Sequence, residues 1–192
     1  MEDGKKLKSL IEQAEILESA LFIARDLGGG DPERMAPPRV EEYVDAAFSK
    51  ILEKKVIKDV LTFTKSYPLY QAVNRAAAVV PRHNGRNIFL EYKPRKAARK
   101  TLMLVGKGVT YDTGGADIKA GGIMAGMSRD KCGASNIAGF MKIVEAMQPE
   151  DIHVIAALCM VRNSVGEVCH VADEMITSRA GVRVRGDSLK LF

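Results

Sequence analysis

Two apolar stretches that resemble strands enclose a stretch with helical periodicity, and this order constrains the fold more than any other feature of the sequence. The two stretches are "TLMLVG", residues 101–106, and "HVIAALCMV", residues 153–161. Between them, apolar residues recur at the three- and four-residue steps that place side chains on one helix face, at Ile137, Met141, Val144 and Met147. Strands interleaved with helices are typical of layered α/β folds. The sequence therefore predicts an α/β fold with a mixed or largely parallel sheet flanked by helices.

Further helices and strands are expected on the N-terminal side of this unit and near the end of the chain. Pro37 and Pro38 can open a helix, because proline fits the first helical turn. From periodicity, we expect helices at residues 7–27, from 37 onward and from 68 onward, and strands at residues 56–63, 87–92 and 182–185. The last of these strands alternates in polarity, and the sequence indicates nothing that packs behind it.

The size and composition of the chain exclude several classes of protein. Its 192 residues, 46% of them hydrophobic, suffice for one domain with a sizeable core. The longest apolar run is far shorter than a membrane span, and the start, "MEDGKKLK", lacks the apolar stretch of a signal peptide. We therefore expect a cytoplasmic protein with no membrane partner. Cys132, Cys159 and Cys169 fit neither a disulfide framework nor a zinc-binding spacing, so free thiols are expected.

The basic residues of the chain are densest in "KPRKAARK", residues 93–100, although the net charge of +5 is modest. A loop of this kind can neutralise phosphates, but no aromatic side chains interleave it to stack on bases. We interpret it as a solvated basic loop, and nucleic acid is not an expected partner.

Lysines, aspartates and glycines crowd the stretch "LVGKGVTYDTGGADIK", residues 104–119. A P-loop would need glycine in place of Thr101 and a hydroxyl residue in place of Gly108. The dinucleotide fingerprint would need its third glycine where Tyr111 stands. The spacing therefore does not favour a phosphate-binding loop.

A metal site fits the same stretch better. Asp112 and Asp130 carry the hard oxygen atoms that divalent cations prefer, and both are expected on non-helical backbone at the carboxyl edge of the sheet. Aspartates in loops also act as helix caps and turn residues, so both interpretations stay open on spacing alone. His83, His153 and His170 have no metal-binding spacing and are expected to be surface or packing residues.

The order of the residues in this loop indicates a protein family more specifically than their composition does. "VGKGVTYDTGG", followed by Lys119 and then by Asp130, resembles the signature region of the leucine aminopeptidase family, the dinuclear metallo-aminopeptidases of the cytosol. "ARDLGGGDPERMAPP" and "IFLEYKP" resemble the family's entry to its catalytic domain and the strand that follows, so the likeness covers about residues 20 to 185. The resemblance implies a zinc-exopeptidase-like fold. Residues 1–86 would be a helical linker and the start of the catalytic domain, and residues 87–192 a partial metallopeptidase catalytic domain.

Carried onto the matching positions, the resemblance implies a site for two divalent ions, zinc or manganese. Lys107 and Asp112 would be metal ligands, with Asp112 bridging both ions, and Asp130 would complete the ligand set of one ion. Lys119 would be catalytic, because its ammonium could stabilise the oxyanion that forms in the reaction. Met127 would line the pocket for the substrate side chain, with simple core packing as the alternative.

Two departures from the family pattern lead to two functional hypotheses. Arg162 stands where the family's "ENxxSG"-like segment has an acidic residue. The chain ends in "RGDSLKLF", with Asp187 as the only carboxylate there, where the family has Asn-Thr-Asp-Ala-Glu-Gly-Arg. The first hypothesis is a C-terminally truncated fragment of a metallo-aminopeptidase that acts on peptides, forms homo-oligomers (hexamers in the family) and is inactive by itself. The second is a truncated, non-catalytic form that acts as a subunit-interaction or basic binding module.

Overall fold

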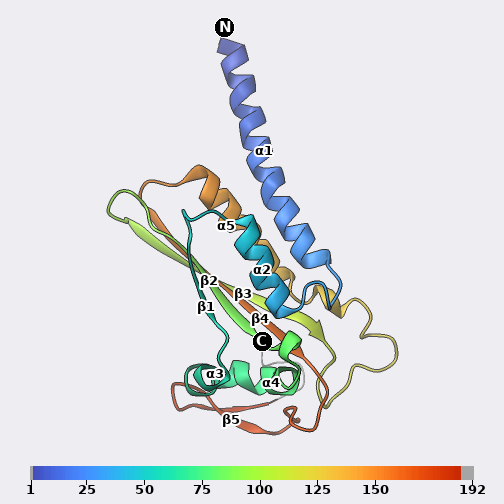
Figure 1. Cartoon of the computed structure of the whole chain (residues 1–192). Helices are drawn as coiled ribbons and strands as arrows, with labels where there is room; N and C mark the ends of the chain where they lie inside the picture. The colour runs from blue at the N-terminus through green and yellow to red at the C-terminus, as the bar shows by residue number, and fades with distance from the viewer. Residues whose placement is uncertain (1, 187–192) are drawn as a thin grey trace.

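A four-stranded mixed sheet forms the centre of the protein (Figure 1). The structure is a computed structural model and describes residues 2–186. The strands are β1 (Glu53–Ile57), β2 (Arg86–Tyr92), β3 (Lys100–Asp112) and β4 (Ile152–Asn163), in the order β1-β2-β4-β3. β2 is antiparallel to both of its neighbours, whereas β3 and β4 are parallel. The predicted α/β fold with a mixed sheet flanked by helices is confirmed.

The described part of the chain also contains five α-helices, the first two of which precede β1, and two short 3₁₀ helices. They are α1 (Glu2–Gly29), α2 (Pro37–Ala47), α3 (Val60–Ser66), α4 (Pro68–Ala78), η1 (Pro81–His83), η2 (Met127–Arg129) and α5 (Cys132–Met147). A small antiparallel hairpin of β5 (Met175–Thr177) and β6 (Arg183–Arg185) follows β4. Within residues 2–186, no helix has both the length and the apolar character needed to cross a bilayer.

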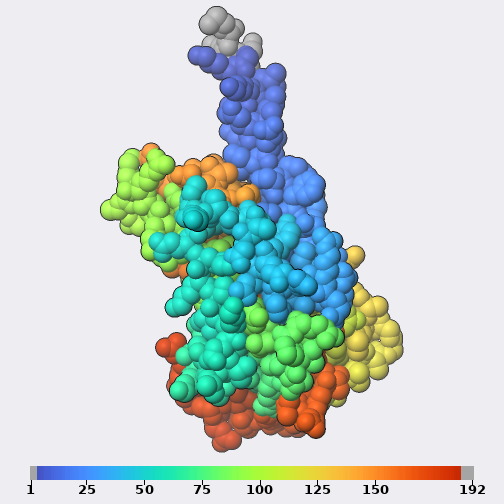
Figure 2. All heavy atoms as spheres, viewed as in Figure 1, coloured from blue at the N-terminus to red at the C-terminus, as the bar shows by residue number. Residues whose placement is uncertain are grey.

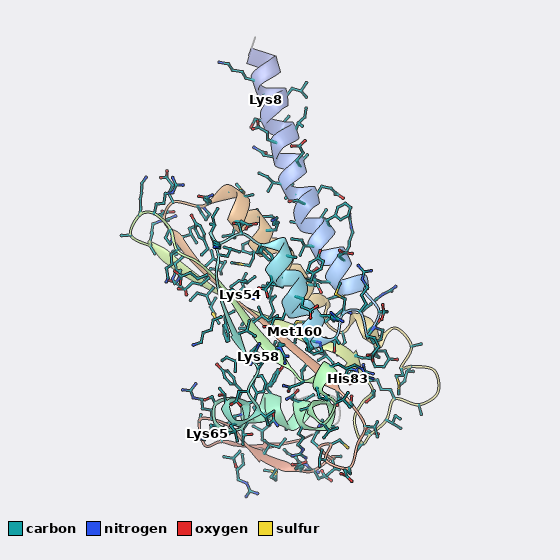
Figure 3. The ribbon with its side chains drawn as sticks, viewed as in Figure 1. Lys8, Lys54, Lys58, Lys65, His83 and Met160 are labelled. Atoms are coloured by element: carbon teal, nitrogen blue, oxygen red, sulfur yellow. The ribbon has the colours of Figure 1, made fainter. Side chains whose placement is uncertain are left out.

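The main core lies between the sheet and helices α1, α2 and α5. Most of its buried side chains come from these helices and from β2 and β4, and they include Leu27, Val44, Leu90, Met141 and Met160, the last of which is labelled in Figure 3. The first turns of α1 extend away from this body (Figure 2). Apolar side chains on that part of the helix are exposed, among them Leu7, Leu10 and Leu17.

Helix α4 covers part of the opposite face of the sheet. Val73 of α4 packs with Val109 of β3 and Val161 of β4 in a second, smaller cluster. Successive side chains of a strand point to opposite faces, so Val109 points away from the face on which Gly106 meets α5. The sheet is therefore covered on both faces at the C-terminal ends of β3 and β4.

Strand β3 is longer than the sequence predicted. We expected it to end at Gly106, but it continues to Asp112, so Lys107 lies within a strand and not in a loop. A Cβ atom at Gly106 would lie 2.5 Å from the Cα of Ala134 in α5, and one at Gly108 would lie 2.5 Å from the carbonyl oxygen of Cys159. The two glycines thus permit close packing inside the strand.

Two other predicted strands also need correction. The segment expected as a strand at residues 56–63 divides into β1 and α3, because Asp59 caps the helix: its carboxylate accepts a 2.7 Å hydrogen bond from the amide of Thr62. The strand expected at residues 182–185 does have a partner, since β6 pairs with β5.

The basic loop at residues 93–100 is largely neutralised by neighbouring acidic residues. Lys93 pairs with Glu53 at 2.7 Å and Arg99 pairs with Asp151 at 2.8 Å, while Lys96 contacts Glu150. These pairs account for much of the loop's charge within the protein itself.

Candidate active site

Asp112 lies at the C-terminal end of β3 and collects three hydrogen-bond donors. The ammonium of Lys119 lies 2.7 Å from its Oδ2. The side-chain amide of Asn163 donates to Oδ1 at 2.7 Å, and the backbone amide of Gly114 donates to the same oxygen at 3.0 Å. The Asp112 carboxylate and the Lys119 ammonium are both largely shielded from solvent, with 8% and 14% of their side chains exposed.

The protonation of Asp112 follows from these contacts. Burial alone would raise the pKa of its carboxyl group, because a charged group is disfavoured away from water. Hydrogen bonds from Lys119, Gly114 and Asn163 outweigh burial, and the net effect is a lowered pKa. Asp112 is therefore an ionised carboxylate at neutral pH, as a metal ligand must be.

A second lysine–aspartate pair involves Lys107 and Asp130. The ammonium of Lys107 lies 2.8 Å from Oδ1 of Asp130. Helix α5 begins two residues after Asp130, and a Cβ at Gly133 would be 3.2 Å from the backbone of Lys107, so the strand and the helix start are in close contact. Oδ2 of Asp130 is buried, and no hydrogen-bond partner reaches it among the described residues.

Met127 connects the two pairs. The ammonium of Lys119 also donates to Sδ of Met127, at 3.2 Å. Met127 opens η2, and its carbonyl oxygen accepts a hydrogen bond from the amide of Asp130 at 3.3 Å. The structure thus links all five candidate residues, those of the two pairs and Met127, through direct contacts beside the C-terminal half of β3.

Asn163 is a site residue that the sequence analysis did not identify. It is the last residue of β4 and stands opposite Asp112 in the parallel register of β3 and β4. Asparagine is common at strand ends and in turns, so its identity carries no signal by itself. The one sequence feature that could have identified Asn163 is its position next to Arg162, in the segment that resembles the family's "ENxxSG"-like motif.

Arg162 takes part in a separate ion cluster around Glu33, which lies between α1 and α2. Glu33 accepts from Arg82 at 2.9 Å and from Arg162 at 3.1 Å, and it lies 2.9 Å from Nε2 of His83. His83 belongs to η1 (Figure 3). The Arg162 guanidinium also lies 5.6 Å from the ring centre of Tyr111. The cluster ties the α1–α2 loop to the end of β4, beside Asn163.

We expect the carboxyl group of Glu33 to titrate at about 2, because the hydrogen bond from Arg82 lowers its pKa and a contact with His83 adds to the effect. Since the pKa in the folded protein is below the ordinary value, this group stabilises the fold above pH 4.5, and its contribution is lost as the pH falls toward 2. Carbon-13 NMR of the carboxyl groups measures the pKa. Arg82→Gln should raise it, and an unchanged value would contradict the assignment.

The donor set can be compared with what a divalent ion requires. Two carboxylates and one amine are suitable ligands, and the buried, unpartnered Oδ2 of Asp130 is an oxygen that a cation would satisfy. Across residues 2–186, no three side chains of the types His, Cys, Asp and Glu group closely enough to hold one ion. The residues present therefore fit part of a metal site, in which Lys107 would supply a nitrogen ligand.

The arrangement of helices and strands matches part of the fold of solved leucyl aminopeptidase structures. The leucyl aminopeptidase of Trypanosoma brucei, solved with bestatin, has a TM-score of 0.80 and 24% sequence identity, with 89% of this chain and 32% of that chain covered. The same enzyme solved with actinonin has a TM-score of 0.81 and 23% identity over the same shares of the two chains. These likenesses concern the fold.

Residues 22–187 match the catalytic domain of the cytosol aminopeptidase family, and the chain belongs to this family. The Caenorhabditis elegans protein called "Putative aminopeptidase" is 44% identical over 93% of this chain and 34% of its own length. The "Probable cytosol aminopeptidase" of Campylobacter jejuni is 31% identical over 95% of this chain and 38% of its own length. The chain thus spans little more than a third of the length of these relatives.

Proposed function

We propose that this chain belongs to the catalytic part of an aminopeptidase that releases N-terminal residues from peptides with the help of two divalent ions, zinc or manganese. One observation carries the proposal: two lysine–aspartate pairs, Lys107 with Asp130 and Lys119 with Asp112, are joined through Met127 beside the C-terminal half of β3. A peptide as substrate, a cytosolic location and a homo-oligomeric assembly follow from the family and belong to the same proposal.

Asp112, Asp130 and Lys107 would hold the ions. Lys107 can bind a metal only as the neutral amine, so metal binding there would release a proton. When bound, divalent ions would supply Lewis-acid chemistry that lowers the pKa of water and polarises the peptide carbonyl group. The described residues provide three of the donors that two ions would need.

Lys119 is suited to stabilise negative charge on the substrate. Its ammonium is mostly shielded from solvent, and its contacts with Asp112 and Met127 fix its position in advance of the reaction. A donor of this kind lowers the barrier when charge develops on the carbonyl oxygen. Met127 lies next to that ammonium, where it could contact the side chain of the substrate's first residue.

A chimera tests this proposal. Residues 22–186 would replace the matching part of the Campylobacter jejuni relative, and we expect hydrolysis of leucine p-nitroanilide in the presence of Mn²⁺. Lys119→Ala should lower kcat about 100-fold, because it removes a preorganised donor to the oxyanion. Lys100→Ala, at an exposed position at the start of β3, serves as the control and should leave kcat unchanged. A folded chimera whose turnover does not depend on Lys119 would refute the proposed role.

A further inference from the structure

The carboxylate of Asp112 is held differently at its two oxygens. Oδ1 receives two N–H donors, the side-chain amide of Asn163 at 2.7 Å and the backbone amide of Gly114 at 3.0 Å. Oδ2 faces the cationic ammonium of Lys119. Two donors from fixed parts of the protein therefore occupy Oδ1, whereas Oδ2 is the oxygen directed toward positive charge.

Asn163 is itself fixed by the surrounding structure. It is 1% exposed, and its backbone carbonyl oxygen accepts hydrogen bonds from both the backbone amide and the side-chain hydroxyl of Thr113, at 3.1 and 2.8 Å. A shift in the register of β3 against β4, between Val109 and Asp112, brings Asp112 directly opposite Asn163. The two side chains thus meet because of the sheet register, and the loop that follows β3 returns to hold Asn163.

The orientation of the Asn163 amide follows from chemistry. An ionised carboxylate can only accept, so the nitrogen and not the oxygen of the amide must face Asp112. The amide oxygen is then left buried, without a partner among the described residues and close to Gly115. An unpaired buried acceptor is unfavourable, and the charge-assisted hydrogen bond to Asp112 offsets part of that cost.

We propose that Asn163 is a positioning residue: it holds Oδ1 of Asp112 and so directs Oδ2 toward a divalent cation. This inference rests on the proposed function, in which Asp112 is a metal ligand. Hydrogen bonds from outside the ligand set orient ligating carboxylates in metal sites, and their loss typically weakens metal binding about 10- to 100-fold. Asn163 does not touch the ion in this account and acts only through Asp112.

Isothermal titration calorimetry of the 192-residue chain with Mn²⁺ tests the inference. Asn163→Leu keeps the size of the side chain but removes the donor, and we expect Mn²⁺ binding to weaken by about tenfold or more. Asn87→Leu is the matched control, because Asn87 is also a buried asparagine of this sheet with an unpartnered amide oxygen, yet it has no contact with Asp112. It should bind Mn²⁺ as the unmodified chain does.

The possible results separate the inference from the function on which it rests. If Asp112→Asn abolishes Mn²⁺ binding but Asn163→Leu binds like the unmodified chain, the positioning role is wrong. If neither the unmodified chain nor the chimera binds Mn²⁺, or if Asp112→Asn binds it equally well, the ligand assignment itself fails. Should Asn163→Leu not fold, NMR of the unmodified chain decides: Zn²⁺ should shift the side-chain amide signal of Asn163 and leave that of Asn87 in place, and an unmoved Asn163 signal overturns the proposal.

Discussion

Replacing Asp112 by alanine is expected to lower the free energy of unfolding by about 4 kcal/mol, because it removes one partner of a buried ion pair. The ammonium of Lys119 would remain in a largely shielded position without its carboxylate. The side-chain amide of Asn163 and the backbone amide of Gly114 would lose their acceptor at the same time. Urea unfolding followed by circular dichroism measures the change.

Asp117→Ala is the control for this experiment. Asp117 lies in the same loop but is exposed, so its replacement should change the free energy of unfolding by no more than about 0.5 kcal/mol. The double variant Asp112→Ala with Lys119→Met adds a second check, because removing both charges should recover part of the lost stability. Equal effects of Asp112→Ala and Asp117→Ala would show that the ion pair contributes nothing to the fold.

The same contacts that stabilise the chain also prearrange the candidate site. A buried carboxylate with three donors is costly to desolvate, and a protein that only needed a turn after β3 could form it without charged side chains. Lys107 and Asp130 form a second lysine–aspartate pair that is more exposed, and Oδ2 of Asp130 remains unpartnered within residues 2–186. Both pairs lie beside the C-terminal half of β3, where the proposed function needs charged side chains.

Much of the fold could be predicted from periodicity. Helices α1, α2, α4 and α5 and strands β2 and β4 lie close to where the apolar patterns placed them. The helices α2 and α5 and both strands bury apolar side chains in the main core, and α4 does so in the smaller cluster, whereas Leu10 and Leu17 of the expected stripe on α1 are exposed. The extent of β3 could not be predicted in this way. Gly106 and Gly108 interrupt the apolar pattern of this strand. Glycine is needed at these positions because α5 and β4 approach the strand closely, and that approach is a property of the tertiary structure.

In the candidate site, too, some features could be predicted from the sequence and others depend on the tertiary structure. The identities of Lys107, Asp112, Lys119 and Asp130 were available from the motif, and the structure pairs them; their roles as ligands and catalyst stay predictions. The contact of Asn163 with Asp112 depends on a register shift between two strands that are 51 residues apart in sequence at this point. No local pattern encodes such a shift. Asp187, the carboxylate noted near the end of the sequence, lies outside the described residues.

Gly114→Ala is expected to lower the free energy of unfolding by about 3 kcal/mol, as the sum of two effects. Gly114 has a φ of 89°, a left-handed conformation that is strained for alanine. A Cβ there would also lie well under 3.0 Å from the carbonyl oxygen of Asp117, and within 3.2 Å of Cγ of Lys119. Backbone cannot move aside as a flexible side chain can, so the loop must shift and carry Lys119 away from Asp112.

Gly121→Ala separates the two effects. Gly121 also has a positive φ, of 67°, but nothing lies within 4 Å of the position that its Cβ would take. Strain alone should then cost about 1 kcal/mol. Urea unfolding of both variants gives the difference, which is the part due to crowding. In the active chimera, Gly114→Ala should reduce kcat far more than Gly121→Ala, because only Gly114 donates to Asp112 and lies against Lys119. Equal losses of stability in the two variants would mean that the loop adjusts freely, and the packing of Asp117 against Gly114 would then not position the site.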